Sequence, residues 1–133
     1  MMTSDINQFL SASAFAVAGA SNDRNKYGNK VLRCYLQHGK KVYPVNPREQ
    51  FIEGIAAIQN IADLPAEVSS LSVITPPAVT EKIIEQAIKK GIKNIWLQPG
   101  AESDQAIEIA QKHGVNIIAG GPCILVTLGF KDN

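Results

Sequence analysis

The loop at residues 19–22 is the part of this sequence whose residue types best fit the binding of an anion. It consists of Gly19, Ala20, Ser21 and Asn22, and it follows an apolar stretch that we expect to be a strand. A glycine here lets the backbone turn sharply, and backbone N–H groups and the Ser21 hydroxyl can donate to phosphate near the start of the next helix. An ordinary strand-to-helix turn would use the same residues. We favour phosphate binding because of the basic residues that follow.

Basic residues are concentrated behind this loop. The stretch 24–48 has seven of them and no acidic residue, although the formal net charge of the chain is only +1. They are Arg24, Lys26, Lys30, Arg33, Lys40, Lys41 and Arg48. Lys26 and Tyr27 open the next helix, where they either close over a ligand or stay in solvent. A local excess of positive charge in a nearly neutral chain suits a small anionic ligand.

The residues at the end of the second predicted strand indicate which class of nucleotide the site would bind. A nicotinamide dinucleotide site normally has a G-x-G-x-x-G loop and an acidic residue at the end of this strand. Here the next glycine after Gly19 is Gly28, and the strand ends in Asn46, Pro47 and Arg48. An arginine suits a phosphate on or near a ribose, as in NADP or in the 3′-phosphate of coenzyme A.

The remaining candidates for chemistry have structural explanations. His38 and His113 lie at predicted helix ends, where an imidazole can cap free carbonyl groups. Cys123 has no base near it in the sequence and is expected to be a small buried side chain, and Trp96 is expected in the core. The acidic residues form no close pair, and no cluster has the spacing of metal ligands. We therefore expect no catalytic site and no metal site.

Length and composition favour one compact domain over residues 1–133. The chain is 45% hydrophobic, which is enough for a single core, and its sequence pI is about 7.8. A nucleic-acid or membrane-surface protein would usually carry its charge globally, so neither partner is expected. Residues 1–12 do not form a signal peptide and are predicted to be an extension or a short helix. We expect a cytoplasmic protein with two free thiols.

Apolar runs alternate with helical patterns, which predicts an α/β fold with a parallel sheet. Helices are predicted between most strands, with a further turn at 124–128, whereas 48–65 has little regular structure. The predicted strands are residues 14–19, 41–45, 71–74, 94–97 and 115–119.

We expect a doubly wound five-stranded sheet in the order 3-2-1-4-5, with helices on both faces. Ligands of such sheets bind outside the carboxyl ends of the strands. These ends are predicted at 19–22, 45–48, 75–77, 98–100 and 120–123, where Gly, Pro and small polar residues gather.

Several short segments together resemble the small bacterial CoA-binding-domain proteins, which are similar to the N-terminal domain of the succinyl-CoA synthetase alpha subunit. The resemblance covers roughly residues 14–125, with the order and spacing of that family. The segments are Gly-Ala-Ser-Asn at 19–22, Val-Asn-Pro-Arg at 45–48, Ala-Asp-Leu-Pro at 62–65, Trp-Leu-Gln-Pro-Gly at 96–100, and Cys123.

The resemblance implies a Rossmann-like domain that binds coenzyme A or a related nucleotide. By position, residues 19–22 would meet the phosphates, and residues 46–48 the ribose or adenine side. Thr75, Pro76 and Pro77 would meet the adenine or the pantetheine arm, and Gln98 and Gly100 would border the far end. Pro122 belongs to a stretch that looks like the Gly-Pro-Asn-Cys of the synthetase. Where this chain has 75–77, the small proteins commonly have an arginine-containing stretch.

The leading hypothesis is a non-catalytic protein that binds coenzyme A or an acyl-CoA as a sensor, carrier or partner subunit. The alternative is an enzyme, either an NADP-linked oxidoreductase or the nucleotide-binding component of an acyl-CoA ligase that needs a partner chain. A third hypothesis is a domain that works through protein contacts alone. A homo-oligomer is compatible with all three.

Overall fold

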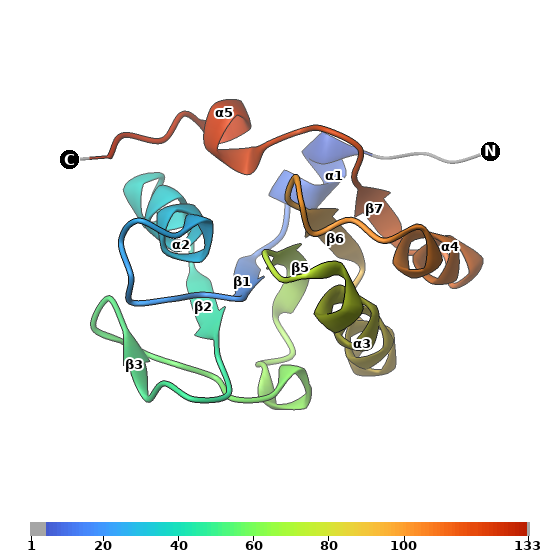
Figure 1. Ribbon diagram of the computed structural model, residues 1–133, viewed down its shortest axis with the longest axis horizontal. Helices are drawn as coiled ribbons and strands as arrows, with labels where there is room; N and C mark the ends of the chain where they lie inside the picture. Colours follow the sequence, from blue (N-terminus) through green and yellow to red (C-terminus); the bar gives the residue numbers. More distant parts are fainter. Residues whose placement is uncertain (1–4, 133) are drawn as a thin grey trace.

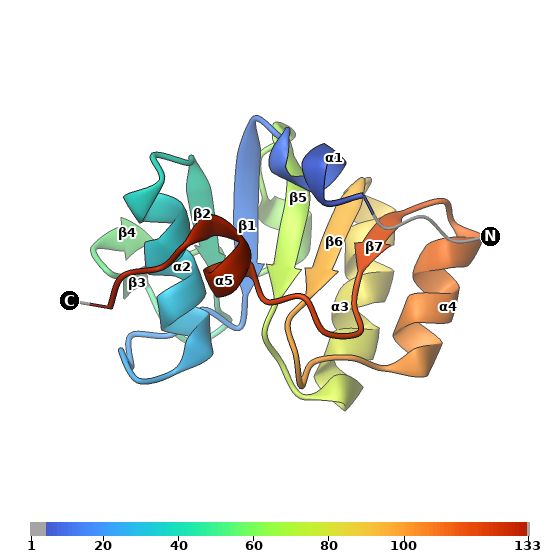
Figure 2. The same cartoon turned by 90° about the horizontal axis from the view of Figure 1, so that it is seen from above.

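The computed structural model describes residues 5–132 and contains a five-stranded parallel sheet between two layers of helices (Figures 1 and 2). The α/β fold class and the helices on both faces confirm the prediction. The strands of the sheet, in spatial order, are β2 (Val42–Val45), β1 (Ala14–Ala18), β5 (Val68–Val73), β6 (Asn94–Leu97) and β7 (Asn116–Ile118).

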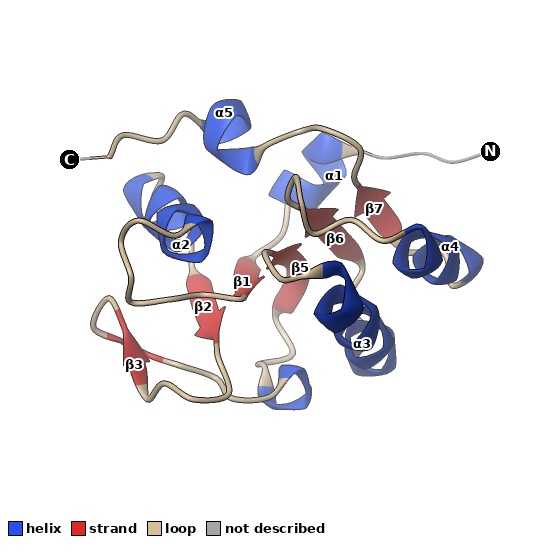
Figure 3. Ribbon diagram, in the orientation of Figure 1, coloured by secondary structure: helices blue, strands red, loops and turns tan. Residues whose placement is uncertain are grey.

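The helices divide between the two faces of the sheet (Figure 3). One face carries α1 (Ile6–Leu10), α2 (Tyr27–Gln37) and α5 (Ile124–Leu128). The other carries α3 (Pro77–Lys90), α4 (Asp104–Lys112) and the short 3-10 helix η1 (Ile61–Asp63). Helix α1 lies inside the segment predicted to be an extension or a short helix, and residues 1–4 of that segment lie outside the described residues.

The predicted strand order 3-2-1-4-5 is wrong. The third predicted strand, β5, pairs with β1 instead of lying outside β2, so the order in the same count is 2-1-3-4-5. Nearly every residue of β5 is buried, as expected of a central strand. The β2–β5 connection also lacks the long crossover helix that would cover an outer strand. The winding therefore reverses between β1 and β5, and ligand sites are expected at such a switch point.

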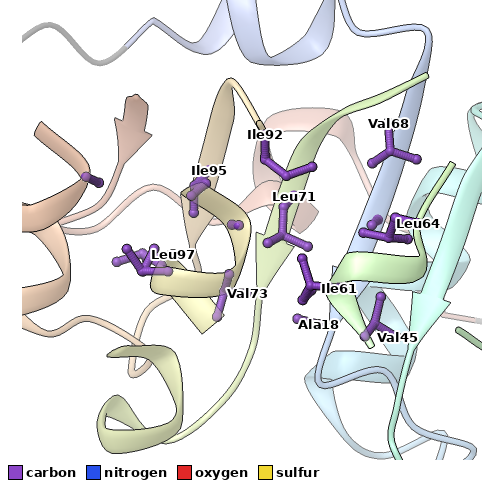
Figure 4. Close-up of a cluster of buried hydrophobic side chains, with 14 of the residues drawn as sticks. Ala18, Val45, Ile61, Leu64, Val68, Leu71, Val73, Ile92, Ile95 and Leu97 are labelled. Atoms are coloured by element: carbon purple, nitrogen blue, oxygen red, sulfur yellow. The ribbon is translucent and has the colours of Figure 1, made fainter. Parts of the chain in front are cut away.

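Each face of the sheet has its own hydrophobic core. Successive side chains of a strand point to opposite faces, so the alanines of β1 pack on the α3 face whereas Phe15 and Val17 pack on the α2 face. Figure 4 shows how Ile61 and Leu64 reach from the η1 region toward Leu71 of β5. The small alanines leave room for these larger neighbours. Both cores anchor the strands whose carboxyl ends form the candidate site.

The connection between β2 and β5 is more ordered than its sequence suggested. It contains an antiparallel hairpin of β3 (Phe51–Ile52) and β4 (Ile55–Ala56), followed by η1. Glu53 and Gly54 form its turn with φ values of 51° and 77°, which fits the tight turns of two-residue hairpins. The hairpin lies beside the start of α2, where Glu53 accepts hydrogen bonds from Arg24 and Asn29. Among the described residues, no helix is long and apolar enough to cross a membrane.

Candidate functional site

Two glycines allow α2 to approach the end of β1 closely. A Cβ atom at Gly28 would collide with the carbonyl group of Gly19, and one at Gly19 would collide with the carbonyl oxygen of Ile74, after β5. Gly19 also has a φ of 89°, which residues with side chains rarely adopt. The start of α2, the loop 19–22 and the ends of β1 and β5 therefore meet within one small region.

Asparagine side chains hold the carbonyl groups of the loop. Asn46 donates from Nδ2 to the Ala20 carbonyl oxygen at 2.9 Å, and Asn29 donates to the Ser21 carbonyl oxygen at 2.8 Å. Within residues 5–132, the backbone N–H groups of Ser21 and Asn22 donate to no protein acceptor. The Ser21 hydroxyl accepts a bond from the Asp23 N–H and keeps its own proton for donation. The loop thus offers donors to an anion.

Four adjoining cavities follow the carboxyl ends of the strands. The first, which we call the loop cavity, has a volume of about 440 Å³. Its walls come from the loop, the start of α2 and the end of β2. It is lined by Gly19, Ala20, Ser21, Lys26, Tyr27, Gly28, Asn46 and Ile74.

The second cavity, which we call the α3 cavity, shares Gly19 and Asn46 with the loop cavity and has a volume of about 280 Å³. It lies between the ends of β1 and β2, the η1 region and α3. Most of its surface is apolar, and four longer polar side chains border it. Its other lining residues are Ala18, Val45, Pro47, Gln59, Asn60, Ile61, Thr75, Val79, Lys82, Ile83 and Gln86.

Two further cavities of about 250 Å³ each extend toward β6 and α5. One lies between the loops after β5 and β6 and is lined by Ile74, Thr75, Pro76, Pro99, Gly100 and Ala101. The other, which we call the Cys123 cavity, is lined by Tyr27, Gln98, Pro99 and Cys123. Neighbouring cavities share Ile74, Thr75, Tyr27 or Pro99, so the four adjoin one another, and we call them the row of cavities.

Most of the predicted site residues line these cavities, but Asn22, Arg48, Pro77 and Pro122 do not. Asn22 instead holds the hairpin, since it donates to Glu49 and to the Phe51 carbonyl and accepts from the Glu53 N–H. Arg48 lies exposed beside the α3 cavity residue Pro47, and its N–H is held by the Asn46 side chain. Pro77 begins α3, and the Pro122 carbonyl accepts a bond from the Trp96 indole.

Near the Cys123 cavity, the side chains mainly make contacts that stabilise the fold. Gln98 is 3% exposed, donates to Cys123 Sγ at 3.4 Å and accepts from the Ile124 N–H at 2.9 Å, so its side chain fixes the start of α5. Trp96 is fully buried, as expected. His38 and His113 donate from Nδ1 to carbonyl oxygens one turn back, which confirms their capping roles.

The basic residues of 24–48 are partly neutralised by acids from outside that stretch. Arg24 pairs with Glu53 at 2.8 Å and Lys41 with Glu67 at 2.6 Å, while Asp132 lies 3.0 Å from Arg33 and 3.7 Å from Lys30. Arg24 and Asn29, which both donate to the Glu53 carboxylate, lower its pKa to about 2.

The unpaired cations occupy different ends of the sheet. Among residues 5–132, no acidic side chain pairs with Lys26, Lys40 or Arg48. Lys26 lines the loop cavity, and Arg48 follows β2, whereas Lys40 precedes β2 at the opposite end. Of the basic residues in 24–48, Lys26 and Arg48 are therefore the ones placed to offer their charge to a ligand, and Lys82 of α3 adds a further cation in the α3 cavity.

Sequence reasoning missed the residues that α3 and the η1 region contribute, above all Gln59, Asn60, Lys82 and Gln86. The wrong strand order contributed to the omission, because it placed the third strand outside β2 instead of beside β1. These four residues form no recognisable sequence motif. A correct central placement of β5, argued from its apolar run, would have brought α3 to the site.

The fold and the row of cavities define a class of protein. A parallel sheet with helices on both faces, a glycine turn after β1 and a ligand-sized crevice at the switch point are the features of Rossmann-like nucleotide-binding proteins. The comparisons with known proteins specify the family. Residues 13–129 match the family described as CoA binding domain, and the chain belongs to that family.

Similar proteins include enzyme subunits and uncharacterised chains. The sequence is 30% identical over 130 residues to the alpha subunit of ADP-forming acetate–CoA ligase II from Pyrococcus furiosus, an alignment that covers 90% of this chain and 28% of the relative. The chain thus spans about a quarter of the length of that relative.

Among solved structures, a conserved hypothetical protein from P. furiosus has a TM-score of 0.82 and 37% identity, covering 86% of this chain and 97% of the other. A hypothetical protein from Pyrococcus horikoshii OT3 has a TM-score of 0.85 and 30% identity, covering 90% and 84%.

Proposed function

We propose that the protein binds coenzyme A or an acyl-CoA along the row of cavities and performs no chemistry on it by itself. The observation that carries this proposal is the position of the loop cavity, which is lined by Lys26 and by Ser21 with its free N–H, at the switch point of a CoA-binding-domain fold. The NADP alternative gains no support, because the family description names CoA.

The α3 cavity suits the adenine ring of the ligand. The apolar part of its lining, which includes Val45, Ile61 and Val79, can pack against the faces of the ring, and side-chain amides can meet the donors and acceptors on its edge. Gln59, Asn60 and Gln86 supply such amides. Arg48 and Lys82 lie at the border of this region and are the cations that we assign to the 3′-phosphate of the ribose.

The pyrophosphate of the ligand would then lie over the loop 19–22. Peptide N–H groups at the start of a helix attract phosphate because they are positively polarised and lack intrahelical partners. Lys26 adds a full charge at the same place. From there the pantetheine arm would follow Thr75 and Pro99 toward the Cys123 cavity.

Isothermal titration calorimetry with coenzyme A tests this function, and two lysines provide a matched pair of variants. Lys26→Ala removes the charge in the loop cavity and should weaken binding about tenfold, as expected for a charge-assisted contact. Lys40→Ala removes an unpaired charge at the opposite end of the sheet and should leave the dissociation constant unchanged. No binding of coenzyme A at millimolar concentration by the unaltered protein would refute the proposal.

A second candidate function is that of the nucleotide-binding component of an acyl-CoA ligase whose other part is a separate chain. The observation that favours it is the match to the alpha subunit of an acetate–CoA ligase. Native mass spectrometry of the protein purified from its own cells would report the mass of any retained ligand and the number and kind of chains. A stoichiometric complex with a second chain would support the ligase component, and a bare protein or homo-oligomer would not.

A further inference from the structure

The loop 19–22 owes its shape to a buried side chain that does not line the cavities. In a trans peptide the C=O and N–H groups point in opposite directions, so fixing a carbonyl group also fixes the N–H of the next residue. Asn29 of α2 donates to the Ser21 carbonyl oxygen at 2.8 Å. It therefore sets the direction of the Asn22 N–H, as Asn46 sets that of the Ser21 N–H.

Asn29 is held in one orientation by charged neighbours. Its side chain is completely buried, its Nδ2 also donates to Glu53 Oε2 at 2.9 Å, and its Oδ1 accepts from Arg33 Nε. Donors and acceptors are thereby matched on both ends of the amide, so that a rotated amide would face Arg33 with its N–H groups. The amide has one favourable position.

The groups around Asn29 connect distant parts of the chain. Arg33 is 6% exposed and donates to Asp132 at 3.0 Å and to the Arg24 carbonyl oxygen at 3.3 Å. Arg24 in turn donates to both carboxylate oxygens of Glu53, on the β3–β4 hairpin. Asn29, which orients the loop, is thus itself held by Glu53 of the hairpin and by Arg33. Arg33 is held in turn by the Arg24 carbonyl group before α2 and by Asp132.

We propose that Asn29 is a positioning residue for the phosphate part of the ligand. Held by Arg33 and Glu53, it keeps the Ser21–Asn22 peptide in the orientation that receives phosphate, and Asp132 supports this arrangement through Arg33. This inference rests on the proposed function, because it concerns the same loop. It assigns part of the affinity for phosphate to a neutral side chain that lies outside the cavity lining.

Asn29→Asp is the direct test, with coenzyme A, ADP and adenosine as probes in calorimetric titrations. The substitution keeps the size of the side chain and an acceptor for Arg33, but it places a carboxylate oxygen against the Ser21 carbonyl oxygen and the Glu53 carboxylate, both of which lose the bond that Asn29 donates. We expect the affinity for coenzyme A and for ADP to fall about tenfold, because one hydrogen-bonded arrangement is lost. The affinity for adenosine, which has no phosphate, should change less than about twofold. Asn25→Asp adds the same charge to the exposed segment before α2 and serves as the control.

Each outcome of this experiment is informative. Equal weakening by Asn25→Asp would assign the effect to charge alone and overturn the inference, as would unchanged ADP binding or a parallel loss of adenosine binding. If Asn29→Asp does not fold, Asp132→Asn replaces it, with Glu85→Gln as its control. We then expect about threefold weaker ADP binding at constant adenosine binding, and no change would overturn the inference. Failure of the unaltered protein to bind coenzyme A or ADP would instead refute the proposed function.

Discussion

At the scale of single residues, neutral side chains and glycines shape the candidate site more than charged groups do. Asn29 and Asn46 hold the carbonyl groups of the loop, and Gly19 and Gly28 permit the contact between α2 and the strand ends. Charged groups act mainly in pairs such as Arg24 and Glu53. Substitutions of these residues should therefore separate effects on shape from effects on charge.

Gly28→Ala should reduce both stability and ligand affinity. The added Cβ would collide with the backbone of Gly19, and such overpacking typically costs about 1–3 kcal/mol. Urea denaturation measures the first effect and titration with coenzyme A the second. Gly39→Ala is the control, because Gly39 has open space around it and a φ of 67°, so that only the backbone cost of roughly 1 kcal/mol applies. Unchanged affinity in Gly28→Ala would contradict the role of this close approach.

The Glu53 carboxylate should make the stability depend on pH. Its pKa is about 2 in the folded protein, against an ordinary value of 4.5, because Arg24 and Asn29 donate to the charged form. Its contribution is therefore complete above pH 4.5 and is lost as the pH falls toward 2. Glu53→Gln should lower the free energy of unfolding by about 1 kcal/mol near neutral pH, and the deficit should shrink on acidification. An equal deficit at pH 6 and pH 3 in urea titrations would exclude this explanation.

At the scale of secondary-structure elements, the position of β5 beside β1 creates the α3 cavity. The apolar periodicity of the sequence was sufficient to predict all the strands of the sheet and the helices α2 to α5. The strand order was predicted wrongly although the buried run of β5 favours a central strand, because the order was argued from connection rules, which allow this strand outside β2 as well as beside β1. The carboxyl-end rule still located residues such as Ser21, Thr75 and Gln98 at the site, since it does not depend on which strands are neighbours.

Ion pairs and side-chain hydrogen bonds account for the other failures of prediction. Asp132 lies 99 positions from Arg33, and no pattern in the sequence connects them. The excess of basic residues in 24–48 therefore suggested more available charge than the folded chain has. For Asn22, a loop position was predicted correctly, but its side chain faces the hairpin because Glu53 and Phe51 approach it there.

Val79→Trp should block the α3 cavity without unfolding the protein. Val79 is 44% exposed, so a larger side chain can extend over the cavity from α3 without entering the core. If the cavity binds adenine, the affinity for both coenzyme A and adenosine should fall at least about tenfold. Val126→Trp, on the 82% exposed Val126 of α5, is the matched control and should leave binding unchanged. Normal adenosine binding by Val79→Trp would place the adenine elsewhere.

Asn22→Ala should loosen the β3–β4 hairpin. This side chain makes hydrogen bonds to Glu49, to the Phe51 carbonyl and from the Glu53 N–H, which tie the hairpin to the loop. Hydrogen–deuterium exchange should become faster across residues 49–57, by about tenfold for a loss near 1.4 kcal/mol, and stay unchanged in α4. Asn25→Ala should show no such change. Uniformly faster exchange would indicate global destabilisation instead of a local connection.

At the scale of the whole molecule, one end of the sheet carries the features of a ligand site. The four cavities, the free N–H groups of the loop, Lys26 and Arg48 all lie at the carboxyl ends of the strands, while Lys40 lies at the other end. The core on each face packs against β1, β5 and β6 in the middle of the molecule, so the carboxyl ends of these strands are held in place beneath the cavities. This arrangement suits a preformed site for an extended nucleotide.

A titration with coenzyme A followed by two-dimensional amide NMR tests the central claim most directly, because it reports binding and location together. The account predicts saturable shifts at residues 19–22, 26–29, 46–48, 59–61, 74–76 and 98–100, with little change at Lys40 and in α4. An absence of shifts at millimolar coenzyme A, or shifts centred on the opposite end of the sheet, would contradict it.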